Sequence, residues 1–172
     1  MHAMLRMAFR LSADLEAAFA QVNDQLADTL PDGHFVTAFI GLLDPATHRL
    51  RFLSGGQGPI LHFQAAEGDC RTYKATSFPM GAMPVSNPRP AVELTLEPGD
   101  ILALLTDGVY EYEDPGGEQF SRERVERILR EQHGQPASVL SSLILDSVRA
   151  FARGSPQEDD ITIVLVKREA AQ

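Results

Sequence analysis

Two acidic clusters in this chain of 172 residues have side chains suited to metal chemistry. The first is Asp107, which follows an apolar run and precedes Gly108. The second is the pair Asp159 and Asp160, which stands directly before the apolar run 161–166. Hard cations such as Mg²⁺ and Mn²⁺ prefer oxygen ligands of this kind. Each cluster alone also has a plainer interpretation, because Asp-Gly is a common turn and acidic residues before a strand are commonly solvated.

The pairing of two strands decides between these interpretations. If the strand that ends at Thr106 and the strand that begins at Ile161 are antiparallel neighbours, the end of one lies beside the start of the other. Asp107 and Asp159 would then converge. Carboxylates that close repel each other unless a cation lies between them. The pairing is therefore the geometric hypothesis on which a metal site depends.

Helical and strand patterns alternate along the chain in blocks. Up to about Leu30 the apolar residues recur at helical spacing, which predicts the tail of one helix followed by a second with Ser12 as its N-cap. Helical spacing returns from Ser121, where the residues 134–136 divide two further helices. Between these blocks we expect strands at 35–43, 48–53, 60–63, 71–75, 92–96 and 101–106, the first two forming a hairpin across the turn 44–47.

The final strand, 161–166, is strongly β-branched. It must pair with a strand laid down far earlier, and its apolar character along its whole length favours a central strand as that partner. Residues 78–90 are crowded with Pro and Gly and are expected to form a loop. Helices, then strands, then helices and a last strand predict an α+β fold with antiparallel sheets.

Composition narrows the functional classes. The formal net charge is −9, which disfavours nucleic acid and anionic membranes as partners, since both are bound mainly through Lys and Arg. The chain has no apolar run of the roughly 18 residues that a membrane span needs. Its one cysteine, Cys70, fits a reducing compartment and is expected to be structural, so we expect a cytoplasmic protein.

Ordered motifs then identify a family. The segment 96–100 followed by Thr106-Asp107-Gly108 resembles the "pGD…TDG" block of the metal-dependent protein serine/threonine phosphatases, protein phosphatase 2C-like, and most of all their SpoIIE-type branch. Further blocks of that family have counterparts in the same order at 22–26, 35–38, 43–44, 54–59, 78–83, 117–120 and 159–162. The resemblance covers essentially the whole chain, which we interpret as a single phosphatase-like domain, 1–172.

The resemblance implies a domain of two stacked antiparallel β-sheets flanked by helices, with two Mg²⁺ or Mn²⁺ ions. Such ions activate a water that attacks phosphoserine or phosphothreonine without a phosphoenzyme. Asp107 and Asp159 match metal-ligand positions of the family. Asp160 is expected to support them or to be structural, Gly108 to allow a tight turn that frees Asp107, and Glu111 to be a structural hydrogen-bonding residue rather than a ligand.

Two departures from the family pattern bear on activity. The acidic strand and Asp-Gly turn that precede the first helix in the family, and that complete its metal site and sheets, have no counterpart here. Gly56 and Gln57 fall where the family has a substrate-side loop, and Gln57 stands in place of the usual His. Glutamine cannot act as an acid near neutral pH, so any proton transfer at this position would be lost. The alternative interpretation is that this position only shapes a loop.

Two hypotheses of function follow. The first is a catalytic domain that acts on a phosphorylated protein, for which the SpoIIE-type resemblance implies an anti-sigma-factor antagonist, an N-terminal sensory or receiver domain in the parent chain and possible homodimers. The second is a pseudophosphatase that uses the same fold as a protein-binding module. Gln57 and the incomplete metal site favour the second, whereas the presence of both Asp107 and Asp159 favours the first.

Overall fold

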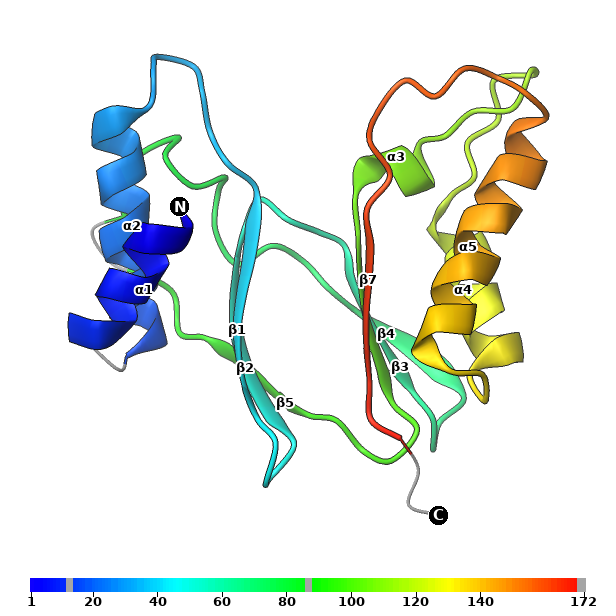
Figure 1. Ribbon diagram of the computed structural model, residues 1–172, viewed down its shortest axis with the longest axis horizontal. Coiled ribbons are helices and arrows are strands. Elements are labelled where there is room, and N and C mark those ends of the chain that lie inside the picture. Colours follow the sequence, from blue (N-terminus) through cyan, green and yellow to red (C-terminus); the bar gives the residue numbers. More distant parts are fainter. Residues whose placement is uncertain (12–13, 86–87, 170–172) are drawn as a thin grey trace. The chain divides into compact units, whose positions relative to one another are not determined.

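The computed structural model describes residues 1–11, 14–85 and 88–169 (Figure 1). They form two compact units. The first unit comprises Met1–Gln57 and Lys74–Thr95, and the second comprises Gly58–Tyr73 and the chain from Leu96 onward. Each unit holds one antiparallel sheet with helices against it, which confirms the α+β prediction. None of the helices in the described ranges is long and apolar enough to cross a bilayer.

The first unit joins two helices to a three-stranded sheet of order β1-β2-β5. Its elements are α1 (His2–Leu11), α2 (Leu15–Thr29), β1 (Ala38–Asp44), β2 (Arg49–Gly55) and β5 (Val92–Thr95). The apolar face of α2 packs on the sheet because Leu15, Phe19, Val22 and Leu26 recur at helical spacing, and all four are buried. Burial of each such side chain stabilises the fold by about 1.5–3 kcal/mol.

Turn chemistry closes the β1–β2 hairpin as the sequence predicts. The Asp44 carboxylate accepts hydrogen bonds from the Ala46 N–H at 2.9 Å and from the Thr47 hydroxyl at 2.7 Å. The first strand begins at Ala38 rather than at Phe35, because Val36 instead forms an isolated bridge with Met80. The expected N-cap, Ser12, lies outside the described residues, and the Asp14 side chain caps α2 by accepting from the Glu16 N–H.

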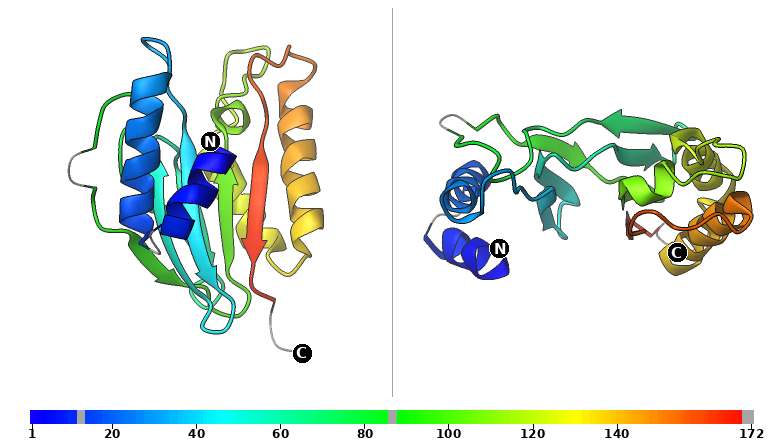
Figure 2. Two further views of the ribbon diagram at one scale, coloured as in Figure 1. Left: turned by 60° about the vertical axis from the view of Figure 1, so that its left-hand side comes forward. Right: turned by 90° about the horizontal axis from the view of Figure 1, so that it is seen from above.

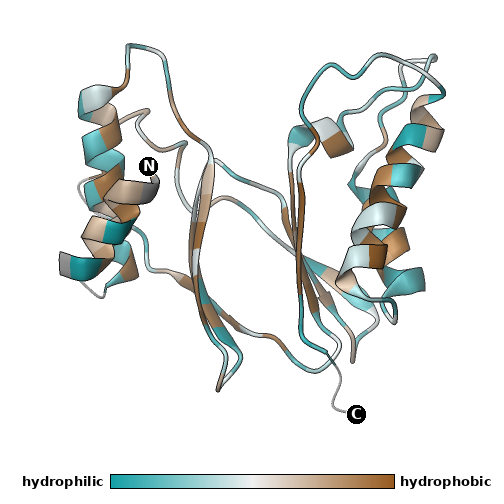
Figure 3. Cartoon of the chain, viewed as in Figure 1, coloured by the Kyte–Doolittle hydropathy of each residue, from teal (hydrophilic) through white to brown (hydrophobic). Residues whose placement is uncertain are grey.

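The second unit joins three helices to a four-stranded antiparallel sheet of order β4-β3-β6-β7 (Figure 2). Its elements are β3 (Ile60–Gln64), β4 (Asp69–Tyr73), β6 (Ile101–Leu105), α3 (Asp107–Tyr110), α4 (Arg122–Gln132), α5 (Ala137–Ala152) and β7 (Ile163–Lys167). Hydrophobic residues run along β6 and β7 and on α5 (Figure 3). The core forms where β6 meets Val125 and Leu129 of α4 and Ile144 and Val148 of α5.

The last strand pairs, as predicted, with a strand that is far earlier in the sequence and central in its sheet: β6 lies between β3 and β7. In the described part of the sheet β7 itself pairs with β6 alone and so forms an edge. Ile163 and Leu165 pack on the core of the second unit, but Val164, which points to the opposite face, is 46% exposed. The β-branched residues here therefore reflect strand propensity and one-sided burial.

A buried polar pair ties the turn before β6 to β3. The His62 Nε2 lies 2.8 Å from the Asp100 Oδ2, and both side chains are almost fully buried. Asp100 also accepts hydrogen bonds from the Ala65 N–H at 2.9 Å and the Glu97 N–H at 3.0 Å. Removal of one member of such a pair leaves buried polar groups unsatisfied and costs about 3–5 kcal/mol. The "pGD" segment is thus structural in this fold.

A carboxylate anchors α2 to the sheet of the first unit. Both oxygens of Glu16 accept from the Arg51 Nη2 at 3.0 Å, and one of them also accepts from the Ala91 N–H at 2.8 Å. Burial alone would raise the pKa of Glu16. The hydrogen bond from Ala91, further hydrogen bonds and the charge of Arg51 outweigh it and lower the pKa to about 2. The ionised form is therefore the one that the fold stabilises.

We predict that Glu16→Gln lowers the free energy of unfolding at pH 7 by about 1–3 kcal/mol. Because the folded pKa is depressed, the contribution of Glu16 is complete above the ordinary value of 4.5 and disappears as the pH falls through about 2. Urea unfolding of the wild type and of Glu16→Gln between pH 7 and pH 2 should show the difference in their free energies of unfolding decrease over that pH range. Glu67→Gln, at an exposed residue, is the matched control, and a difference independent of pH would contradict the assignment.

Candidate metal centre

The hypothesis of strand pairing is confirmed. β6 and β7 are antiparallel neighbours, with Leu105 opposite Ile163 and Ile101 opposite Lys167. The end of β6 therefore lies beside the start of β7. Asp107 follows β6 and Asp159 precedes β7, so the topology brings the two predicted ligands to one end of the sheet. Figure 1 shows α3, which begins at Asp107, beside the segment that leads into β7.

Thr106 joins the two segments just beyond the regular strands. Its N–H donates to the Thr162 carbonyl at 3.1 Å, and its hydroxyl donates to the Asp160 carbonyl at 2.9 Å. The same hydroxyl accepts from the Thr162 N–H at 2.9 Å. A hydroxyl is both donor and acceptor, so one side chain satisfies two backbone groups here. These bonds fix the chain on both sides of the site.

Asp107 is the first residue of the short helix α3. Val109 and Tyr110 of this helix are buried in the core of the second unit, whereas Asp107 itself is exposed. The Glu111 N–H donates to the Asp107 carbonyl at 2.8 Å and closes the turn. Val109 and Tyr110 thus hold one side of α3 against the core, and Asp107 lies on the exposed side.

Gly108 takes an ordinary helical conformation, without a positive φ, in the one-turn helix α3. Its expected role in freeing Asp107 stays a prediction. A Cβ at this position would lie 2.5 Å from the Asp160 carbonyl oxygen and 3.2 Å from that of Asp159. Glycine is therefore required at position 108, because the segment before β7 approaches so closely that any side chain would push α3 and that segment apart.

A cavity of about 450 Å³ opens at this end of the sheet. Both Asp107 and Asp159 line it. Four further acidic residues line it as well: Glu111, Glu113, Asp114 and Glu158. Among the described residues, no Lys or Arg lines it. Such a concentration of like charge attracts cations strongly. Carboxylate oxygens are also the ligands that Mg²⁺ and Mn²⁺ prefer, so the donor chemistry fits a divalent metal.

The described residues supply only part of a coordination sphere. Within 1–11, 14–85 and 88–169, no three His, Cys, Asp or Glu side chains are grouped so that they could hold a metal ion. Asp107 and Asp159 therefore fit a metal site by donor type and by position, but they supply only two side-chain ligands. Divalent hard cations need six or more oxygen ligands, and the rest would fall to water or to groups outside these ranges.

The other predicted residues of the second unit have definite places. The backbone of Asp160 accepts from Thr106, and its N–H donates to the Asp159 Oδ1 at 2.7 Å. Glu111 lines the cavity, and its backbone makes a structural hydrogen bond to the Asp107 carbonyl. That its carboxylate is not a metal ligand stays a prediction. Glu113, Asp114 and Glu158 were not predicted to belong to the cavity, although the acidic content of 111–114 could have signalled it.

Gly56 and Gln57 belong to the first unit. The Gly56 N–H donates to the Ser77 carbonyl at 3.0 Å, and the Ser54 hydroxyl donates to the Gln57 carbonyl. Gly56 has a φ of +72°, and a Cβ there would lie 2.7 Å from the ring of Pro79. Glycine is thus needed for the conformation and for the close contact. The substrate-side role of this pair stays a prediction.

Cys70 of β4 has the character of a structural cysteine. Burial, with a smaller effect from the Glu126 charge, raises the pKa of its thiol to about 12. The thiol is therefore protonated at neutral pH, and the nucleophile in thiol chemistry is the thiolate.

We predict that Gly108→Ala disrupts the centre without changing any carboxylate. The added methyl group must displace the Asp159–Asp160 backbone, at a cost of about 1–3 kcal/mol. Gly134→Ala is the matched control, because nothing lies within 4 Å of a Cβ there and its φ is ordinary. Thermal unfolding should show a lower midpoint for Gly108→Ala and little change for the control. Equal midpoints would refute the close contact.

Comparisons with known proteins agree with this architecture. A family model described as Stage II sporulation protein E (SpoIIE) matches residues 1–169. Protein IcfG of Synechocystis sp. is 31% identical over 147 residues, which are 85% of this chain and 23% of that protein. The chain thus spans less than a quarter of the length of the curated relative that it matches.

Solved structures match at the level of the fold. The SiaA-PP2C domain of Pseudomonas aeruginosa has a TM-score of 0.78 at 21% identity, over 98% of this chain and 66% of that chain. The PP2C phosphatase domain of SpoIIE from Bacillus subtilis, solved with a fragment of its regulatory domain, has a TM-score of 0.75 at 21% identity, over 96% and 47%. From its family-model match and its two antiparallel sheets, the chain belongs to the SpoIIE family and has the fold of PP2C phosphatase domains.

Proposed function

We propose that this chain provides the larger part of a metal-dependent protein serine/threonine phosphatase domain. One observation carries the proposal: Asp107 and Asp159, separated widely in sequence, line one acidic cavity at the paired ends of β6 and β7. Membership of the SpoIIE family and the PP2C fold support a phosphoric monoester hydrolase rather than another metal-dependent activity. The two aspartates are the residues to which we assign metal binding.

The charge of the cavity supports metal dependence. A phosphate monoester is an anion, and six carboxylates around one cavity would repel it. Mg²⁺ or Mn²⁺, two ions in the intact domain, would neutralise that charge and provide an activated water for attack on phosphorus. One solved structure of the Bacillus subtilis SpoIIE phosphatase domain is from manganese-presoaked material, which supports the choice of ion.

The residues of this chain contribute position and charge in the proposed reaction. Asp107 and Asp159 hold the cations, and the hydrogen bonds of Thr106 and the close contact at Gly108 keep the two segments together. Asp160 supports this arrangement through its backbone. The remaining acidic residues of the cavity raise the local cation concentration.

The substrate that we propose is a protein phosphorylated on Ser or Thr, of the anti-sigma-factor antagonist type. Support comes from the family, because the resemblance to the SpoIIE-type branch extends along almost the whole chain. The Bacillus subtilis relative carries a regulatory domain beside its phosphatase domain. We accordingly propose an N-terminal sensory or receiver domain in the parent protein, possible homodimers and action in cytoplasmic signal transduction.

A second candidate function is a pseudophosphatase that binds a partner protein without catalysis. Two observations favour it: Gln57 replaces the family's usual His, and the described residues hold no group of three potential metal ligands. The two candidates differ in what the parent protein does with a phosphate monoester. A parent protein with every acidic position intact that is inert with each divalent metal would establish the binding module.

We predict that Asp107→Asn and Asp159→Asn each lower the Mn²⁺-dependent hydrolysis of p-nitrophenyl phosphate by the parent protein at least about 100-fold, because each removes a metal-binding charge. Asp146→Asn makes the same change at an exposed position of α5 and should leave the rate unaltered. Initial rates over a range of Mn²⁺ concentrations measure the effect. Full activity in either variant at saturating Mn²⁺ would remove that aspartate from the site.

For the 172-residue chain by itself we predict weak metal binding, with a dissociation constant on the order of 1 mM or weaker for Mn²⁺. Two carboxylates leave most of the coordination sphere to water. Isothermal titration calorimetry, with the double variant Asp107→Asn/Asp159→Asn as the control, measures this constant. Micromolar binding that the double variant abolishes would show that the chain completes the site by itself.

A further inference from the structure

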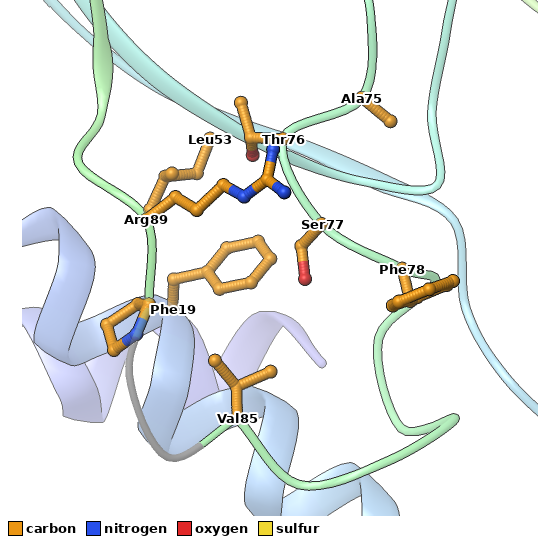
Figure 4. A pocket seen from close by; sticks show the side chains of 9 residues that line it. Phe19, Leu53, Ala75, Thr76, Ser77, Phe78, Val85 and Arg89 are labelled. Carbon is orange, nitrogen blue, oxygen red and sulfur yellow. The ribbon is translucent and has the colours of Figure 1, made fainter.

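The first unit contains a second cavity, of about 340 Å³, that plays no part in the proposed reaction. It lies among α2, the end of β2 and the described parts of the loop 75–89 (Figure 4). Phe19 and Leu53, both almost fully buried, form its floor. Val85 and the exposed ring of Phe78 form part of its walls. These side chains give the cavity an apolar floor and partly apolar walls, and its volume lies within the range of small-molecule sites.

The polar groups of this cavity are suited to an anion. The Arg89 side chain extends over the cavity, and the Ser77 hydroxyl points into it (Figure 4). Among the described residues, neither the Arg89 guanidinium nor the Ser77 hydroxyl has a hydrogen-bond or ion-pair partner. No Asp or Glu in the described part of the chain lines the cavity, although the chain carries 24 acidic residues against 15 basic ones. A guanidinium that has no counter-charge among the described residues, together with a hydroxyl beside it, can bind a carboxylate or a phosphate.

Contacts from α2 hold the loop around the cavity at several points. Asn23, which is buried, accepts from the Gly81 N–H at 3.1 Å and donates to the Met83 carbonyl at 2.9 Å. Asp24 accepts from the Val85 N–H at 2.9 Å. Glu16 holds Ala91, two residues beyond Arg89. The walls are thus positioned by hydrogen bonds before any ligand arrives, which reduces the entropic cost of binding.

We propose that this cavity binds a small organic anion, with an apolar body and one carboxylate or phosphate group. Arg89 and Ser77 would receive the anionic group, and Phe19, Leu53 and Val85 would contact the apolar body. The compact cavity favours a small molecule over a peptide, because an extended chain needs a long groove. This site is separate in kind from the metal centre: among the described residues, the charged residues that line the metal-centre cavity are all acidic, whereas the one charged residue that lines this cavity is Arg89.

Binding of 2-naphthoate, an aromatic carboxylate, tests the proposal on this chain. Amide spectra recorded by ¹⁵N NMR should show saturable shifts at Thr76, Ser77 and Phe78, with a dissociation constant on the order of 1 mM for a ligand of this size. Arg89→Gln should weaken binding about tenfold or more, because it removes a charge-assisted hydrogen bond. Arg6→Gln removes the same charge from an exposed position of α1 and should leave the affinity unchanged.

Two further measurements separate the anionic group from the apolar body. The neutral amide 2-naphthamide should bind more weakly than 2-naphthoate and equally to the wild type and Arg89→Gln. Val85→Phe, which fills the cavity, should block both compounds while its spectrum stays that of a folded chain. Absence of saturable shifts at residues 76–78, or equal affinity of Arg89→Gln and the wild type for 2-naphthoate, would overturn the proposal. So would saturation by a phosphoserine peptide that 2-naphthoate cannot displace.

Discussion

The antiparallel ladder between β6 and β7 is the interaction on which the metal centre depends. Backbone hydrogen bonds hold the two strands in a single register, and a slip of one residue would turn the apolar side chains of β7 away from the core. Thr106 continues the ladder beyond its last regular pair. Because of this continuity, the aspartates that follow one strand and precede the other share a cavity. The carboxylates themselves contribute nothing to holding the segments together and would, without a cation, drive them apart.

Much of this arrangement could be predicted from the sequence because it depends on local patterns. The hairpin across 44–47 follows from the turn chemistry of Asp44, and the helices α4 and α5 follow from apolar residues at helical spacing. The pairing of β6 with β7 could be predicted from the sequence for a different reason. Few strands of an α+β chain carry an acidic residue at the correct end, and the ordered motifs restricted the choice further.

Other features could not be predicted, because they depend on contacts between distant segments. The need for glycine at 108 arises from the backbone of Asp160, and the sequence around Gly108 gives no sign of it. The edge position of β7 depends on which strands are present to pair with it. The burial of the His62–Asp100 pair depends on the approach of two chain segments. Arg89 likewise has no motif around it, and only the fold places its side chain over a cavity.

The contacts of α2 also have a consequence for the mechanics of the first unit. Glu16 lies in the first turn of α2, Asn23 and Asp24 lie about two turns further along, and each is bonded to a different point of the sheet or of the loop that follows. A rigid helix bonded in this way can neither slide along its axis nor rotate about it without breaking several hydrogen bonds at once. Any displacement of α2 would therefore carry Gly81, Val85 and Ala91 with it or break their hydrogen bonds together, rather than proceed as a gradual adjustment.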